Sequence, residues 1–267
     1  MYSTQLLHRT NQHIHIVNQK IFGRINKINL LSVLITLTKN MLSKFPRPSV
    51  TIDCVVFGYD GADLSILLIN RNEEPYKNFW TIPGGFLHID ETFEAAAQRI
   101  LQTKTGLAEL FLEQLYTFDA TDRDPRGRVL SVVYFSLINP LKYNIVAGSA
   151  ANDIKWYKTS KLPKLGFDHK EIIKTALTRL KSKVTYQPMG FELLNTHFTL
   201  TELQQLYECI LEKEIDKRNF RKKILSTKIL KATGLKKTGL KNRQPELYSF
   251  DQEAYKNLLN EGFQFQI

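Results

Sequence analysis

The segment Trp80–Leu107, WTIPGGFLHIDETFEAAAQRILQTKTGL, constrains the fold of this chain more than any other. Apolar residues recur at helical spacing through its second half, which predicts an amphipathic helix. Asp90 is the expected N-cap of this helix, and Gly106 is its expected C-terminal stop. Gly84 and Gly85 lie in the turn that precedes the helix. The segment therefore predicts a loop, a helix and a second loop.

Strand-like patterns flank this segment on both sides. Before it, apolar residues alternate at 50–56 and run through 65–69, around a turn at Asp60 and Gly61, which is typical of a hairpin. After it, a second apolar pair spans 111–118 and 129–138 around the charged loop ATDRDPRGR. We expect both pairs to form strands.

The helical segment resembles the Nudix box, the loop–helix–loop of hydrolases that act on nucleoside-diphosphate-linked substrates. The residues that carry the resemblance are Gly85, Glu91, Arg99, Gly106 and Leu107. It extends over about residues 48–160. The resemblance implies the fold of that family, a mixed-sheet α/β/α sandwich within an α+β chain.

Three positions depart from active members of that family, in which the arginine is followed by Glu, an apolar residue, any residue and two Glu. Ile100, Thr103 and Lys104 occupy the three glutamate positions here. Hard divalent cations need such oxygen ligands, so the sequence predicts no metal site, no cofactor and no enzymatic activity. Glu91 and Glu94 remain, and a solvated first helical turn favoured by the helix dipole accounts for them.

A Nudix-like cleft without its chemistry can still bind a small molecule. The candidate effector-binding residues are glycines of the turn, one acid and four arginines: Arg71, Gly84, Gly85, Glu91, Arg99, Arg126 and Arg128. Guanidinium groups bind phosphate and sugar oxygens, although an arginine-rich loop is as often a solvated or subunit-contact surface.

The net charge of +11 is concentrated at the two ends of the chain. Residues 1–44 hold six Lys/Arg and no acid, whereas residues 45–215 hold 19 Lys/Arg against 21 Asp/Glu. Residues 216–243 hold 11 Lys/Arg against Asp216 alone. A polyanionic partner is therefore expected for a local surface rather than for the whole protein.

The basic C-terminal segment has the order of a winged helix-turn-helix. Thr199 and Glu202 form an expected capping box, and Asp216 caps a second helix over 216–230. Residues 231–250 then predict a hairpin with a basic tip, the wing. The candidate DNA-binding residues are Lys217, Arg218, Asn219, Arg221, Lys222, Lys236, Lys237, Lys241 and Arg243. Arg and Asn can pair with bases, whereas Lys meets phosphates; the alternative is a solvated basic helix.

The two halves together resemble the Nudix-related transcriptional regulators, over about residues 46–256. Members of that family sense ADP-ribose or regulate the use of arabinose and other sugars. The resemblance implies a homodimer that binds double-stranded operator DNA, with a sugar or an ADP-ribose-like molecule as effector. It leaves open whether the protein represses or activates. The alternative is a Nudix hydrolase with a basic appendage.

These patterns divide the chain into four parts. We expect an extension at 1–44, disordered or preceding a true start at Met41, and a Nudix-like sensing domain at 45–160. A connecting helix and linker follow at 161–189, and a winged helix at 190–267. The apolar run at 28–37 is too short to span a bilayer, so no membrane contact is expected. The two cysteines have no metal or disulfide spacing, which favours a reducing, cytoplasmic location.

Overall fold

The computed structural model describes residues 44–148, 151–239, 244–260 and 265. The prediction for the N-terminal extension lies almost entirely outside these residues. The described residues from Pro48 onward form one compact unit. Within the described part of the chain, no helix combines the length and apolar character needed to cross a bilayer.

Seven strands form one mixed sheet. They are β1 (Ser49–Tyr59), β2 (Leu64–Arg71), β3 (Trp80–Thr81), β4 (Gly84–Phe86), β5 (Glu113–Phe118), β6 (Val129–Ile138) and β7 (Ala151–Lys158). The order along the sheet is β3-β2-β1-β6-β5, with β4 paired to β1 and β7 paired to β2. Only β1 and β6 run parallel among these pairs of described strands. The expected hairpin of β1 and β2 is confirmed, and so are the two strands expected after α3, although β5 begins two residues later than the apolar run suggested.

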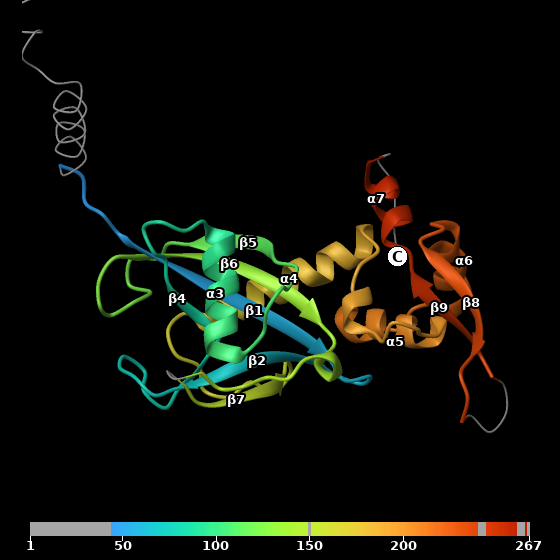
Figure 1. The fold of residues 1–267 in the computed structure, drawn as a ribbon, viewed down its shortest axis with the longest axis horizontal. Helices are drawn as coiled ribbons and strands as arrows, with labels where there is room; N and C mark the ends of the chain where they lie inside the picture. Colours follow the sequence, from blue (N-terminus) through green and yellow to red (C-terminus); the bar gives the residue numbers. More distant parts are fainter. Residues whose placement is uncertain (1–43, 149–150, 240–243, 261–264, 266–267) are drawn as a thin grey trace, which may run out of the picture. The chain divides into compact units, whose positions relative to one another are not determined.

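Successive side chains of β1 point to opposite faces of the sheet, and from Thr51 onward the residues of the strand are buried. Ile52 and Cys54 belong to the core cluster that includes the buried side of α3 (Phe93–Thr105). Val55 and Phe57 belong to the opposite cluster, which includes buried residues of α4 (His169–Tyr186). Helices therefore cover both faces, and the expected α/β/α sandwich is confirmed; Figure 1 shows α3 lying across one face of the sheet.

The N-cap of α3 is Thr92, so the expectation for Asp90 was wrong. Thr92 has extended backbone angles, and its hydroxyl accepts a hydrogen bond from the Ala95 N–H at 3.2 Å. Asp90 lies in the turn before the helix, too far back to cap it. The C-terminal stop is confirmed, since Gly106 adopts a left-handed φ of 75° and its N–H donates to the Gln102 carbonyl.

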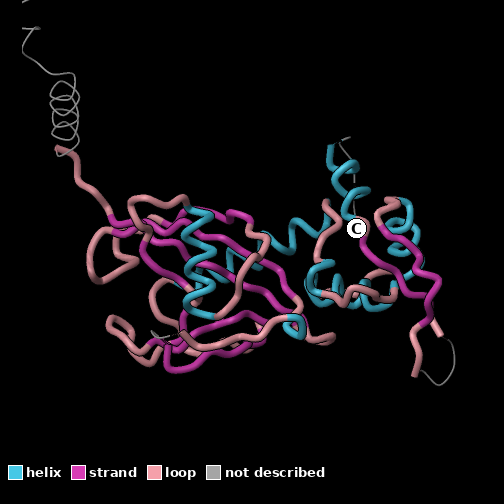
Figure 2. Tube along the Cα trace, in the orientation of Figure 1, coloured by secondary structure: helices cyan, strands magenta, loops and turns pink. Residues whose placement is uncertain are grey.

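The C-terminal part has the expected helix–helix–hairpin order, which Figure 2 shows as two helices followed by paired strands. After the short 3-10 helices η1 (Pro140–Lys142) and η2 (Phe191–Leu193) come α5 (Leu200–Leu211), α6 (Lys217–Ser226), β8 (Leu230–Lys236), β9 (Glu246–Phe250) and α7 (Gln252–Asn260). The capping box is confirmed: the Thr199 hydroxyl accepts from the Glu202 N–H, and the Glu202 carboxylate accepts from the Thr199 N–H. Asp216 caps α6 by accepting from the Asn219 N–H at 2.8 Å.

Helix α6 ends at Ser226, four residues earlier than predicted. The Thr227 hydroxyl donates to the Ile224 carbonyl, and Lys228 then takes a left-handed φ of 58°. The two apolar residues that follow belong to the start of the hairpin, where Leu230 pairs with Phe250 of β9. The end of α6 is therefore set by the pairing of β8 with β9, although the helical pattern of the sequence continues to Leu230.

Candidate functional site

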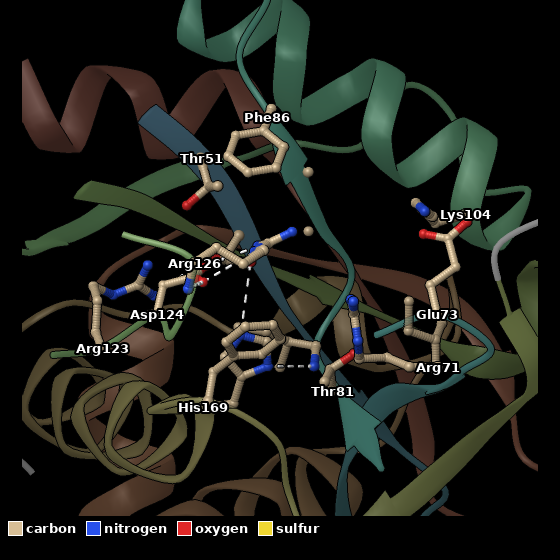
Figure 3. A pocket seen from close by; sticks show the side chains of 16 residues that line it. Thr51, Arg71, Glu73, Thr81, Phe86, Lys104, Arg123, Asp124, Arg126 and His169 are labelled. Carbon is tan, nitrogen blue, oxygen red and sulfur yellow. Dashed lines mark hydrogen bonds and ion pairs between the residues drawn. The ribbon is translucent and has the colours of Figure 1, made fainter. Parts of the chain in front are cut away.

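A cavity of ≈ 140 Å³ opens beside β1, β2 and the end of α3 (Figure 3). Its lining is mainly polar and charged: Thr51, Asp53, Ile69, Arg71, Glu73, Thr81, Ile82, Gly84, Gly85, Phe86, Lys104, Arg123, Asp124, Arg126, Phe167 and His169. Three of these side chains are arginines and one is a lysine, and three others are carboxylic acids. The pocket is therefore suited to a polar, anionic small molecule.

Asp53, Arg123 and His169 form a buried polar cluster in the lining of this pocket. The Asp53 carboxylate accepts a hydrogen bond from the Ser131 hydroxyl, and the Arg123 guanidinium lies 3.7 Å from it. Burial raises the pKa of Asp53 and lowers the pKa of His169 to about 3. His169 Nδ1 accepts from the Ile82 N–H at 3.1 Å, which suits a neutral imidazole.

Two arginines of the pocket are held by bidentate carboxylate contacts. Arg123 donates to both oxygens of Asp168 at 2.9 Å, and Asp168 is the residue before α4. Arg126 donates to Asp124 at 3.0 and 2.7 Å, a hydrogen bond that raises the pKa of Arg126. Such forked pairs fix the guanidinium planes before a ligand arrives.

The third arginine, Arg71, is held more loosely. Its Nε donates to the Pro75 carbonyl at 2.9 Å, and its guanidinium lies 5.1 Å from the centre of the Phe167 ring. Arg126 lies 5.0 Å from the centre of the Phe86 ring. Cation–π contacts of this kind place both guanidinium groups against the two aromatic side chains of the pocket.

The predicted effector residues divide into two groups. Arg71, Gly84, Gly85 and Arg126 line the cavity, whereas Glu91, Arg99 and Arg128 are not among its lining residues. Arg99 binds the Glu91 carboxylate and holds the pKa of Glu91 down at about 2. Its second nitrogen donates to a carbonyl of β4, so this pair ties the loop before α3 to the helix.

Arg128 is used within its own loop, whereas the pocket residues absent from the sequence prediction come from distant parts of the chain. Arg128 donates to the carbonyls of Asp119 and Ala120 at 2.6 and 3.2 Å, and so closes its own loop. Asp53 and His169, by contrast, come from β1 and from the first turn of α4. A polar residue inside the apolar β1 run was the signal that could have drawn attention to Asp53.

The residues of α3 do not fit a divalent cation. Ile100 is 1% exposed and packs in the core, and the Thr103 hydroxyl donates to the Arg99 carbonyl within the helix. Lys104 lines the cavity as a cation. Across the described residues, no group of three or more His, Cys, Asp or Glu side chains could hold a metal ion.

A second surface lies on α6 and the hairpin. A groove there is lined by residues from the start of α5, from α6 and from both strands: Thr199, Leu200, Thr201, Lys217, Arg221, Gly234, Leu235, Lys236, Gln244, Pro245, Glu246 and Tyr248. Asn219 and Lys222 line a different hollow on α6, and Arg218 is exposed. The predicted residues Lys241 and Arg243 lie outside the described part of the chain.

Two of the predicted DNA-binding side chains also make contacts within the protein. The Arg221 guanidinium is half-buried and donates to the Thr201 hydroxyl at 3.1 Å. The Lys237 ammonium donates at 2.7 Å to Glu202, the carboxylate of the α5 capping box. These contacts join α6 and the hairpin to the start of α5.

Comparisons with known proteins match both parts of the chain. The model of the NUDIX domain family matches residues 47–176, and the model of the NrtR DNA-binding winged helix domain matches residues 190–250. The chain is 35% identical over 205 residues to the "ADPR responsive transcriptional repressor NtrR" of Acinetobacter baylyi, covering 75% of this chain and 82% of that protein. It is 34% identical over 160 residues to the ADP-ribose pyrophosphatase of Methanocaldococcus jannaschii, covering 58% of this chain and 91% of that one.

A solved structure shows the same two-part arrangement. Shewanella oneidensis NrtR complexed with a 27mer DNA has a TM-score of 0.69 and 33% sequence identity, covering 78% of this chain and 95% of that one. The mixed sheet with its helices and the helix–helix–hairpin that follows are therefore one recurring combination.

Proposed function

Because this chain belongs to the family of Nudix-related transcriptional regulators, we propose that it is a repressor that binds operator DNA and responds to ADP-ribose. The observation that carries the proposal is the presence in one chain of an exposed basic helix–hairpin surface and a cationic pocket without metal ligands. The A. baylyi relative is named as ADPR-responsive, and the S. oneidensis relative crystallised with DNA. We therefore propose ADP-ribose rather than a sugar as the effector.

In this proposal α6 is the recognition helix and the β8–β9 hairpin is the wing. Arg218 and Asn219, near the exposed start of α6, have the side chains that pair with guanine and adenine edges. Lys217, Lys222 and Lys236 would meet phosphates, which adds affinity without sequence preference. Two copies would bind a palindromic operator, as the symmetry of such sites requires.

The pocket would receive the effector between its arginines and its aromatic rings. Arg71 and Arg126 would bind diphosphate oxygens, and Phe86 and Phe167 offer apolar faces for the adenine. Gly84 has a structural reason to be glycine, since a Cβ there would lie 1.9 Å from an Asp53 carboxylate oxygen. Gly84 and Asp53 therefore lie in direct contact in the lining of the pocket.

A gel-shift experiment with the full chain and the DNA upstream of its own operon tests the proposal. We expect a specific complex that ADP-ribose dissociates and that arabinose leaves intact. Arg218→Ala should abolish specific retention, whereas Lys161→Ala, an exposed lysine in the turn after β7, should retain it. Retention by Arg218→Ala equal to that of the unmodified protein would show that α6 is not the recognition helix.

Hydrolysis of ADP-ribose is the second candidate function, favoured by the identity to the M. jannaschii pyrophosphatase. We propose that this chain has lost that activity, because none of the three ligand positions on α3 carries a carboxylate. Incubation of the purified protein with ADP-ribose and magnesium should release no AMP. Sustained turnover above a heat-inactivated control would establish the hydrolase instead.

A further inference from the structure

We propose that Lys104 takes the place of the divalent cation in this pocket, so that the diphosphate of ADP-ribose binds without any metal. This inference rests on the proposed effector and concerns how the same site recognises it. In a hydrolase of this fold, carboxylates on the helix hold a cation that meets the diphosphate. Here the helix itself supplies a positive charge at the same end of the pocket.

The three former ligand positions on α3 have separated into three different roles. Ile100 has become part of the hydrophobic core, where its side chain lies beside Gly85. Thr103 returns its hydroxyl to the helix backbone at 2.8 Å, which occupies its donor. Only Lys104 still faces the cavity. The one former ligand position that still lines the pocket therefore carries a cationic side chain.

Lys104 is half-buried and has no ion pair within the residues described. Figure 3 shows it entering from α3 beside Glu73, with Arg71 below and Arg126 on the far side of the pocket. Partial burial lowers the pKa of Lys104, and the charge of Glu73 partly opposes that shift. An ammonium that has lost part of its hydration, and that forms no ion pair with the nearby Glu73 carboxylate, gains from a bound anion.

The other cations of the pocket divide in a way that supports this role. Arg123 and Arg126 are already bound to Asp168 and Asp124. Arg71 donates its Nε to a backbone carbonyl, and its guanidinium has no ion pair in the described part of the chain. Arg71 and Lys104 therefore carry the charge that a diphosphate can neutralise. A divalent cation would instead meet like charges there, which repel at short range.

Isothermal titration calorimetry of the full chain with ADP-ribose, in magnesium and in EDTA, tests the inference. The unmodified protein should bind with the same affinity in both buffers. Lys104→Gln should weaken binding about 10- to 100-fold, as expected for the loss of one charge-assisted hydrogen bond. Lys104→Glu should weaken it further in EDTA because a carboxylate repels the diphosphate. Lys161→Gln, which removes an exposed charge elsewhere, should bind as the unmodified protein does.

Binding that requires magnesium would overturn the inference and leave ADP-ribose as the effector. Unchanged affinity in Lys104→Gln would also overturn it. The absence of any ADP-ribose binding in either buffer would refute the proposed effector, and this inference with it. Retention of operator DNA by Lys104→Gln in a gel shift, with loss of its release by ADP-ribose, would show that the variant is folded and has lost only recognition of the effector.

Discussion

Lowering the pH from 7 to 5 should destabilise the folded protein through His169. This imidazole is 4% exposed, and burial holds its pKa at about 3, against an ordinary value of 6.5. Between those two values the unfolded chain binds a proton that the folded chain does not. The contribution of His169 to stability is therefore complete above pH 6.5 and is lost as the pH falls toward 3.

The size of the effect follows from the difference between the two pKa values. Each pH unit below 6.5 removes about 1.4 kcal/mol from the free energy of unfolding, so about 2 kcal/mol is lost at pH 5. Asp53 acts in the opposite sense. Burial raises its pKa, so the folded protein binds a proton on Asp53 at a higher pH than the unfolded chain does and gains stability as the pH falls. A variant that removes only the imidazole is needed to separate the two groups.

His169→Gln provides that control, since its amide oxygen can accept the Ile82 N–H that Nδ1 now accepts. Urea unfolding of both proteins at pH 7 and pH 5 measures the free energies. The unmodified protein should lose about 2 kcal/mol more than the variant over this range. Equal losses in the two proteins, or an NMR titration of His169 centred near 6.5, would refute the reasoning.

Two further predictions concern close packing and the wing. Gly84→Ala should lower the free energy of unfolding by about 1–3 kcal/mol, because the new Cβ would overlap the buried Asp53 carboxylate. Urea denaturation measures this loss, and an unchanged midpoint would contradict the prediction. Lys236→Ala should reduce the salt dependence of DNA binding by about one phosphate contact, whereas Lys237→Ala should change it little because Lys237 is paired with Glu202. Filter binding across a salt series separates the two, and equal slopes for both variants would argue against the pairing.

The sequence predicted well those features that depend on residues within one or two turns. The capping box of Thr199 and Glu202, the Asp216 cap and the Gly106 stop were all confirmed. Each is a contact between a side chain and a backbone group a few residues away, so its residue pattern is visible along the chain. The N-cap of α3 was missed by two residues, although the Thr92 cap is also a local contact. The end of α6 was decided by strand pairing instead, because its last predicted residues join the hairpin.

The composition of the pocket could not be predicted in the same way. Glu91, Arg99 and Arg128 belong to the arginine and box patterns of the sequence, yet they bind each other or nearby carbonyls. Asp53 and His169 stand in no recognisable motif, and the sheet brings β1 beside the start of α4. Whether a charged side chain faces a ligand or a neighbour depends on which groups the fold places within hydrogen-bonding distance.

The sequence alone determined the helix with its missing carboxylates, the strands on either side of it and the order of a basic helix and wing. These follow from periodicity, capping and charge, which are properties of neighbouring residues. Only the tertiary structure decided that Lys104 faces the cavity while Ile100 enters the core and Thr103 binds its own helix. The reason is geometric: one helix presents its successive residues to different surroundings, and packing against the sheet sets which of them meets the ligand.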